Sequence, residues 1–174
     1  MKNKVLLVLS VVLLSVPSAW AATAKAVIAG TAPGSGVSGE VLLSERSGGV
    51  YVEAVVNNLS PGKHGFHIHE NGSCADSGKA AGGHFNPDNV AHGYISKDGM
   101  THAHPGDMGN IEANAKGKGI LKIFLPGVSL TEGKYIIVGK SMIVHTKEDD
   151  FSQPVGNAGD RVGCGIITAV EEKE

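Results

Sequence analysis

The sequence predicts an all-β fold, a sandwich or barrel built from about eight short strands. Two observations support this prediction. Runs of alternating or β-branched apolar residues recur at short spacing, and they are separated by glycine, proline, asparagine and serine, which are typical of turns. The chain also contains 25 glycines, and no stretch keeps a helical period long enough to indicate a substantial helix.

The strands are expected in this order along the chain. KAVIAG, GEVLLSE and GVYVEAVVNNL come first, each bounded by turn residues. HGFHIH is the fourth run, and because successive side chains of a strand point to opposite faces, His67 and His69 should share one face with Ile68 on the other. NIEANA, GILKIFL, YIIVGKSMIVH and CGIITAV follow after a long gap. The expected strands therefore cover residues 25–30, 39–45, 49–59, 64–69, 110–115, 119–125, 135–145 and 164–170.

Residues 1–21 have the features of a secretory signal peptide. Two lysines precede a short apolar run over residues 5–14, and the small residues Ala19 and Ala21 provide a cleavage site. Cleavage after Ala21 would leave residues 22–174, a length suited to one domain with one core. We therefore expect a periplasmic or otherwise secreted protein that has no contact with a membrane once the signal is removed.

The charge of the chain and its two cysteines indicate which partners and which kinds of site are expected. The formal net charge of the chain is −2, and loss of the two leader lysines makes it about −4, a mildly acidic balance that argues against a nucleic acid partner. Cys74 and Cys164 are the two cysteines. In an oxidising compartment their pairing is favoured over free thiols or a thiolate metal site, and a loop of that size could stabilise the fold by roughly 4 to 5 kcal/mol.

The histidines are concentrated in one part of the chain. The strand pattern stops over residues 70–109, where a long loop is unusual unless it is functional or disordered, and its imidazoles argue against disorder. All eight histidines lie between His64 and His145, with enough potential ligands for two ions. Imidazole suits copper and zinc, and the scarcity of carboxylates argues against calcium or magnesium. The H-x-H pair alone is a weak signal that is equally typical of a cross-strand hydrogen-bonding pair.

The whole pattern resembles copper/zinc superoxide dismutase. GFHIHE, GGHFNP, HPGDMGN, IVHTKEDD and GNAGDRVGCG occur in the order of that family, and the likeness covers essentially all of residues 22–174. The HENGSC form is similar to bacterial secreted members. The resemblance implies an eight-stranded Greek-key β-sandwich or flattened barrel, immunoglobulin-like in architecture, with two long functional loops.

The resemblance also implies a ligand set for two metals. Copper would be bound by His67, His69, His84 and His145, and zinc by His84, His92, His104 and Asp107, so that one imidazolate bridges the ions. Asp149 would accept hydrogen bonds from a copper ligand and a zinc ligand, for which His67 and His92 are our choice. Cys74 and Cys164 match the disulfide of the family.

The implied activity is the disproportionation of superoxide to oxygen and hydrogen peroxide by redox cycling of copper. His84 would release copper on reduction and hold a proton for the next step. Arg161 would lie beside the copper channel and attract the anion. His64, out of phase with His67 and His69, is expected to be a hydrogen-bonded structural residue, and His102 is the alternative to His104 at zinc.

One departure from the family pattern supports a competing function. The loop between His145 and Arg161 is short, and Val155 stands where a threonine commonly borders the channel, so the guidance of superoxide is open to question. Lys79 or Lys97 could compensate from the long loop. The alternative function is a non-enzymatic periplasmic protein that binds copper or zinc on the same scaffold. Homodimerisation stays open.

Overall fold

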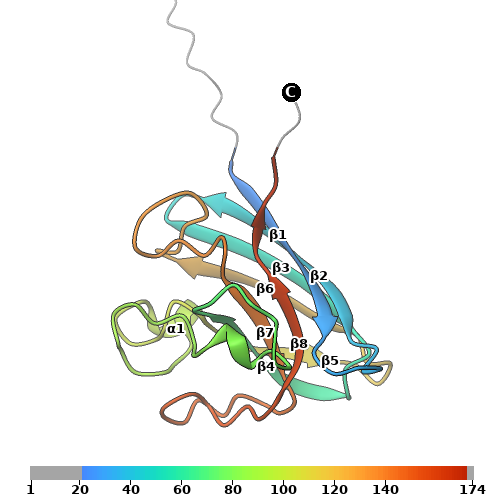
Figure 1. The fold of residues 1–174 in the computed structure, drawn as a ribbon. Coiled ribbons are helices and arrows are strands. Elements are labelled where there is room, and N and C mark those ends of the chain that lie inside the picture. Colours follow the sequence, from blue (N-terminus) through green and yellow to red (C-terminus); the bar gives the residue numbers. More distant parts are fainter. Residues whose placement is uncertain (1–20, 172–174) are drawn as a thin grey trace, which may run out of the picture.

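The computed structural model describes residues 21–171 and shows an antiparallel β-barrel (Figure 1). Residues 1–20, which hold most of the predicted signal peptide, and residues 172–174 lie outside the described part. The strands are β1 (Thr23–Gly30), β2 (Ser38–Arg46), β3 (Gly49–Asn57), β4 (Gly62–His69), β5 (Asp107–Ala113), β6 (Gly119–Pro126), β7 (Ser141–His145), β8 (Arg161–Ile166) and β9 (Thr168–Ala169).

Eight of these strands close on themselves. Their order is β2-β3-β6-β5-β4-β7-β8-β1, and β1 also pairs with β2, so that the sheet has no open edge; β9 adds a two-residue extension along β1. The predicted all-β barrel is thus confirmed. β3 pairs with β6 rather than with β4, the strand that follows it in the sequence. The connection from β3 to β4 therefore passes over β6 and β5, as the long connection of a Greek key does.

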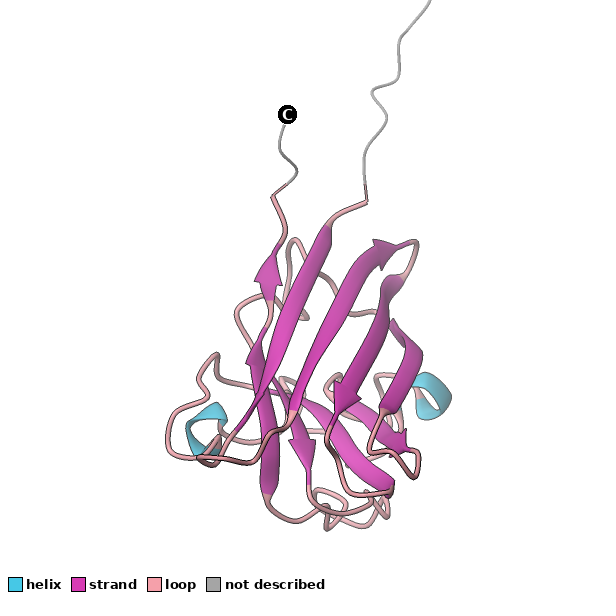
Figure 2. Ribbon diagram, turned by 90° about the vertical axis from the view of Figure 1, so that its right-hand side faces the viewer, coloured by secondary structure: helices cyan, strands magenta, loops and turns pink. Residues whose placement is uncertain are grey.

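Helix is confined to two short segments within residues 21–171. They are η1 (Lys79–Ala81) and α1 (Ile95–Asp98), drawn in cyan at opposite margins of the barrel in Figure 2. Both belong to the long connection between β4 and β5. Neither is long and apolar enough to cross a membrane.

The last two expected strands differ most from the observed ones. β7 begins only at Ser141 rather than at residue 135, because Gly139 has a left-handed φ of 83° and the Lys140 N–H closes a turn on the Ile137 carbonyl. The apolar residues before that turn are part of the core without being a strand, since Ile137 is fully buried. The last run, expected over residues 164–170, begins earlier at Arg161 and is split into β8 and β9 around Ile167, whose N–H bonds to the Lys140 carbonyl.

The middle of β4 is buried on both faces, and this positions the site. Phe66 and Ile68 are fully buried in the main core of the barrel, whereas His67 and His69 alternate with them on the outer face. That outer face is covered by the 70–106 loop, which carries η1 and α1, and by the 146–160 loop between β7 and β8 (Figure 1). The two covering loops therefore convert an outer strand face into a buried polar site.

Candidate metal centre

The first group of side chains comes from two neighbouring strands and one loop. His67 and His69 lie on β4 and His145 ends β7, which pairs with β4 so that His67 is opposite Ile143 and His69 opposite Ser141. His84, from the 70–106 loop, is joined to this edge by an isolated bridge with His69. Each of the four histidines is buried and offers one ring nitrogen, and these nitrogens all lie within 4.8 Å of one another.

Backbone carbonyls determine how two of these rings are protonated. His69 Nδ1 is 2.9 Å from the Gly82 carbonyl and His145 Nδ1 is 3.1 Å from the Gly159 carbonyl. Because a carbonyl only accepts, both Nδ1 atoms must carry the proton, which leaves Nε2 as the lone-pair nitrogen in the neutral ring. The two Nε2 atoms face each other at 3.4 Å. Two lone pairs this close repel each other, and a cation bound between them would remove this repulsion.

The second group surrounds the carboxylate of Asp107 at the start of β5. Oδ1 lies 2.8 Å from His84 Nδ1 and 2.9 Å from His104 Nδ1. Oδ2 accepts hydrogen bonds from the N–H groups of Gly93 and His104. His92 Nδ1 is also 2.9 Å from Oδ2 but is not aligned for a hydrogen bond. Three imidazole nitrogens and one carboxylate oxygen are the donor set and number that suit a tetrahedral zinc site.

Asp149, in the 146–160 loop, joins the two groups. Its fully buried carboxylate accepts hydrogen bonds from His67 Nε2 at 2.8 Å and from His92 Nε2 at 3.0 Å. In its neutral form each of these rings therefore has its proton on Nε2 and its lone pair on Nδ1. Among the residues described, His67 Nδ1 and His92 Nδ1 are the two buried side-chain atoms without a hydrogen-bond partner. A buried unpaired nitrogen is costly, and a metal ligand bond accounts for both, so the residues fit metal binding.

The electrostatics of the first group favour neutral rings. Burial, reinforced by neighbouring imidazoles, lowers the pKa of His69 to about 2, that of His145 to about 3 and that of His84 to about 4. For His84 the Asp107 carboxylate opposes this shift only in part. Neutral imidazole is the form that binds a metal through one nitrogen, so His69 and His145 need lose no proton on binding near neutral pH. A His84 ring that binds through both nitrogens would lose its remaining proton.

The carboxylates act in the opposite sense on His92. Burial alone would lower its pKa, but Asp107 and Asp149 together raise it to about 9. Burial also opposes ionisation of the two acids, yet their contacts with the histidines hold the pKa of each well below its usual range. The two carboxylates thus favour a cation in the cluster around Asp107, and metal binding there would displace a proton from His92.

The first group opens onto solvent through a pocket of about 290 Å³. Its lining includes His69, His84, His145, Val155 and Arg161. Arg161 begins β8 directly opposite His145, and its guanidinium donates to the carbonyls of Gly78 and Gly82. Burial lowers its pKa from a value so high that the side chain stays charged. A fixed positive charge beside these histidines gives the pocket a preference for a small anion.

Gly82 is required at this point by its conformation and its surroundings. Its φ is 75°, in the left-handed region, and a β-carbon there would collide with the Glu70 carboxylate. The Gly82 carbonyl accepts hydrogen bonds from both His69 Nδ1 and Arg161 Nη2. One carbonyl therefore sets the position of a strand histidine and of the pocket arginine together.

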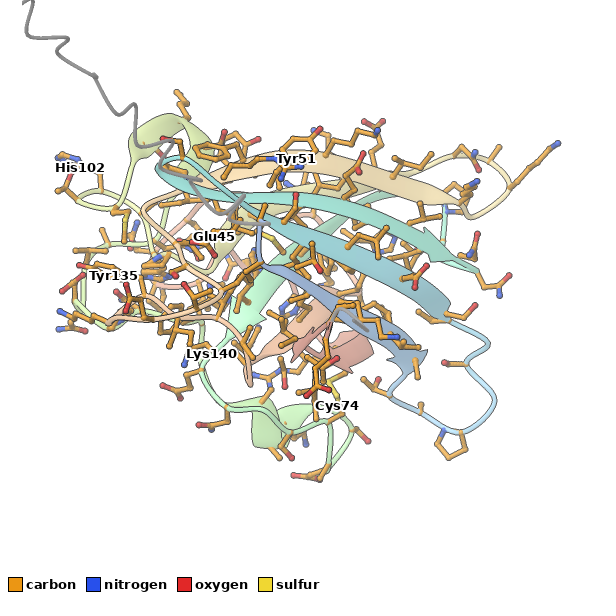
Figure 3. All side chains as sticks on the ribbon, turned by 90° about the horizontal axis from the view of Figure 1, so that it is seen from above. Glu45, Tyr51, Cys74, His102, Tyr135 and Lys140 are labelled. Atoms are coloured by element: carbon orange, nitrogen blue, oxygen red, sulfur yellow. A yellow bond between two sulfur atoms is a disulfide. The ribbon has the colours of Figure 1, made fainter. Side chains whose placement is uncertain are left out.

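The disulfide that was predicted is present. Cys74 is joined to Cys164 of β8 with a Cα–Cα distance of 5.7 Å, and it ties the 70–106 loop to the strand that carries Arg161. Figure 3 labels Cys74 beside the strands at the lower part of that view. Cys164 packs with Ala81 of η1 and Ile143 of β7, and Ile143 is the residue paired with His67, so the linkage lies beside the first group of histidines.

Other predicted residues lie apart from both groups. His102 projects from the margin of the molecule, where it contacts Thr101, whereas His104 lies in the second group (Figure 3). His64 is buried, with Nδ1 2.7 Å from the His145 carbonyl and Nε2 2.8 Å from the Ser60 carbonyl. Neither Lys79 nor Lys97 is among the residues that line the pocket.

Sequence reasoning missed two residues that contact the site. Gln153 forms two hydrogen bonds with the backbone of His92, and Phe151 stacks on the His92 ring. Neither belongs to a recognisable motif, because both act through the conformation of an irregular loop. The position of this loop close to Asp149 is the one signal in the sequence that could have directed attention to them.

Comparison with known proteins agrees with this geometry. A family model described as "Copper/zinc superoxide dismutase (SODC)" matches residues 37–167, well over half of the chain. The chain belongs to the copper/zinc superoxide dismutase family. The matched region begins just before β2 and extends past β8, so it includes every residue of the two histidine groups.

Relatives within the copper/zinc superoxide dismutase family come from several kingdoms. The chain is 42% identical to the extracellular superoxide dismutase [Cu-Zn] of Caenorhabditis elegans, with 68% of this chain and 55% of the relative aligned. It is 40% identical to superoxide dismutase [Cu-Zn] 5 of Dictyostelium discoideum, with 77% and 91% aligned. The superoxide dismutase [Cu-Zn] of Brucella abortus is 38% identical, with 79% and 82% aligned.

Proposed function

We propose that the protein is an exported superoxide dismutase whose two cofactors, copper and zinc, occupy the two histidine groups. Copper is assigned to His67, His69, His84 and His145. Zinc is assigned to His84, His92, His104 and Asp107. The reaction converts two superoxide anions and two protons into one molecule of oxygen and one of hydrogen peroxide.

The observation that carries the proposal is the shared position of His84. Its ring belongs to both groups of potential ligands, with Nδ1 beside the Asp107 carboxylate and Nε2 on the side of the other three histidines. The ring centroids of His84 and His67 are only 4.1 Å apart. One imidazole with a nitrogen toward each group is what a bridge between two metal ions requires.

Copper bound there would supply the one-electron redox chemistry by which one superoxide is oxidised to oxygen and another is reduced to peroxide. The residues of the chain bind the anion and hold the metal ligands in place. Arg161 is held by the carbonyls of Gly78 and Gly82, so its guanidinium is available to pair with the small anion without reorganising. The pocket of about 290 Å³ that His84 and Arg161 line has ample room for superoxide.

His84 Nε2 is the atom best placed to hold a proton for the departing peroxide. His84 lines the pocket, and the contact of its Nδ1 with Asp107 would keep the ring in place as Nε2 changes partner. The Asp149 carboxylate holds His67 and His92 by their Nε2 atoms, so the two groups stay in register during such a change.

Export is the second part of the proposal. The disulfide suits an oxidising compartment, and two relatives are named extracellular superoxide dismutases, one from Caenorhabditis elegans and one from Drosophila melanogaster. The bacterial relative from Brucella abortus and the HENGSC form support a periplasmic location. Residues 1–21 would be the signal peptide and residues 22–174 the secreted domain.

The proposal is tested by following a pulse of superoxide in the presence of the purified protein loaded with copper and zinc. A second-order rate near the diffusional ceiling, about 10⁸ to 10⁹ M⁻¹s⁻¹, is expected. Both metals bound with decay no faster than in buffer would instead leave a non-enzymatic metal-binding protein. N-terminal sequencing of the exported form, with a start at Ala22 expected, checks the proposed signal peptide.

A further inference from the structure

The backbone of His92 is held by the side chain of Gln153. The His92 N–H donates to Gln153 Oε1 at 3.0 Å, and Gln153 Nε2 donates to the His92 carbonyl at 2.8 Å. One amide thus satisfies both main-chain polar groups of one residue, as a neighbouring strand would. The contact joins two loops that are 61 residues apart in the sequence.

No regular structure performs this task for His92. The residue lies in an irregular part of the 70–106 loop, and its N–H and carbonyl have no backbone partner within residues 21–171. Its neighbours are fixed by other side chains: the Asn86 amide bonds to both main-chain groups of Val90, and the Gly93 N–H donates to Asp107. Gln153 therefore holds the main chain at His92 itself, the proposed metal ligand.

The same short segment also contacts the His92 ring. Asp149 accepts from Nε2 at 3.0 Å, and the Phe151 ring stacks on the imidazole with centroids 6.4 Å apart and planes within 20°. Asp149 fixes the edge of the ring and Phe151 covers its face. Neither contact acts on the main chain of His92, which Gln153 holds directly.

Gln153 belongs to the same turn as Val155, a residue of the pocket wall. Residues 150–156 form a compact turn in which the Asp150 N–H bonds to the Gly156 carbonyl and the Gly156 N–H to the Ser152 carbonyl. The far side of this turn carries Val155, which lines the pocket beside His84 and Arg161. A displacement of His92 would thus be transmitted through Gln153 to the pocket wall.

We propose that Gln153 is a positioning residue for zinc, which fixes the main chain of His92 and couples zinc retention to the wall of the copper pocket. This inference rests on the proposed assignment of His92 as a zinc ligand. Loss of partners that orient a metal ligand commonly costs 10- to 100-fold in metal affinity.

The test follows zinc in the protein loaded with both metals. Gln153→Met keeps the length and much of the volume of the side chain and removes both hydrogen bonds. We expect this variant to transfer zinc to the chelator 4-(2-pyridylazo)resorcinol about 10 to 100 times faster than the unmodified protein, with copper retained. With cobalt in place of zinc, the visible spectrum of the variant should shift, since one ligand is displaced.

Asn114→Ala provides the matched control. Asn114 accepts hydrogen bonds from two backbone N–H groups, those of Lys116 and Lys118, in the β5–β6 turn away from the metal ligands. Its loss should leave both the zinc transfer rate and the cobalt spectrum unchanged. Equal acceleration in Asn114→Ala and Gln153→Met would overturn the proposal, because it would indicate general destabilisation.

A second variant keeps the test decisive if Gln153→Met does not fold. Gln153→Glu retains the acceptor for the His92 N–H and loses the donor to the His92 carbonyl, so zinc transfer should again accelerate. Zinc retention equal to that of the unmodified protein in whichever variants fold would overturn this inference alone. Failure of the unmodified protein to take up zinc would overturn the zinc site of the proposed function and this inference with it.

Discussion

Reduction of the Cys74–Cys164 disulfide should lower the free energy of unfolding by about 4.6 kcal/mol at 25 °C. The two cysteines are 90 residues apart, and a cross-link closing a loop of this length removes roughly 15 cal/mol/K of entropy from the unfolded chain. The folded state should change little on reduction. Cys164 stays packed with Ala81 and Ile143, and the buried Ser141 hydroxyl still bonds to the Asn71 carbonyl and the Ser73 N–H.

The assay is urea unfolding of the metal-free protein, so that metal binding does not contribute to the measured stability. With a denaturant slope of about 2 kcal/mol/M, the unfolding midpoint should fall by roughly 2 M on reduction. The double variant Cys74→Ser with Cys164→Ala should show a similar fall without any reductant. A midpoint that moves by less than about 0.5 M in both cases would refute the argument that the cross-link acts on the unfolded chain.

Three further predictions concern the attraction of superoxide by Arg161, the bridging of the two metals by His84 and the hydrophobic core of the barrel. Arg161→Ala should lower the superoxide decay rate about tenfold and weaken its dependence on salt, and an unchanged, salt-insensitive rate would contradict a guiding role. His84→Ala should lose zinc and alter the electron paramagnetic resonance spectrum of bound copper; a normal copper spectrum with zinc retained would exclude the bridge. Phe66→Ala should cost about 3 to 5 kcal/mol in urea unfolding because Phe66 is fully buried, whereas Val27→Ala, at a site 64% exposed, should change stability by less than about 0.5 kcal/mol.

Much of the barrel and the types of ligand could be predicted from local patterns. Strand alternation predicts that Phe66 and Ile68 face one side of β4 while His67 and His69 face the other, and the structure has this arrangement because a strand has a period of two. The same reasoning failed over residues 135–140. There, apolar content reflects burial, as at Ile137, and burial does not require an extended chain.

What the sequence by itself determined is the chemistry available: imidazoles in a fixed order, one arginine beside a glycine-rich segment, and two cysteines able to pair. Only the tertiary structure decided which atoms meet. Gln153 contacts His92, and the Gly82 carbonyl joins His69 to Arg161, through loop conformations that have no periodicity to reveal them. The physical reason is that a strand imposes its side-chain directions locally, whereas an irregular loop takes its shape from hydrogen bonds to distant segments.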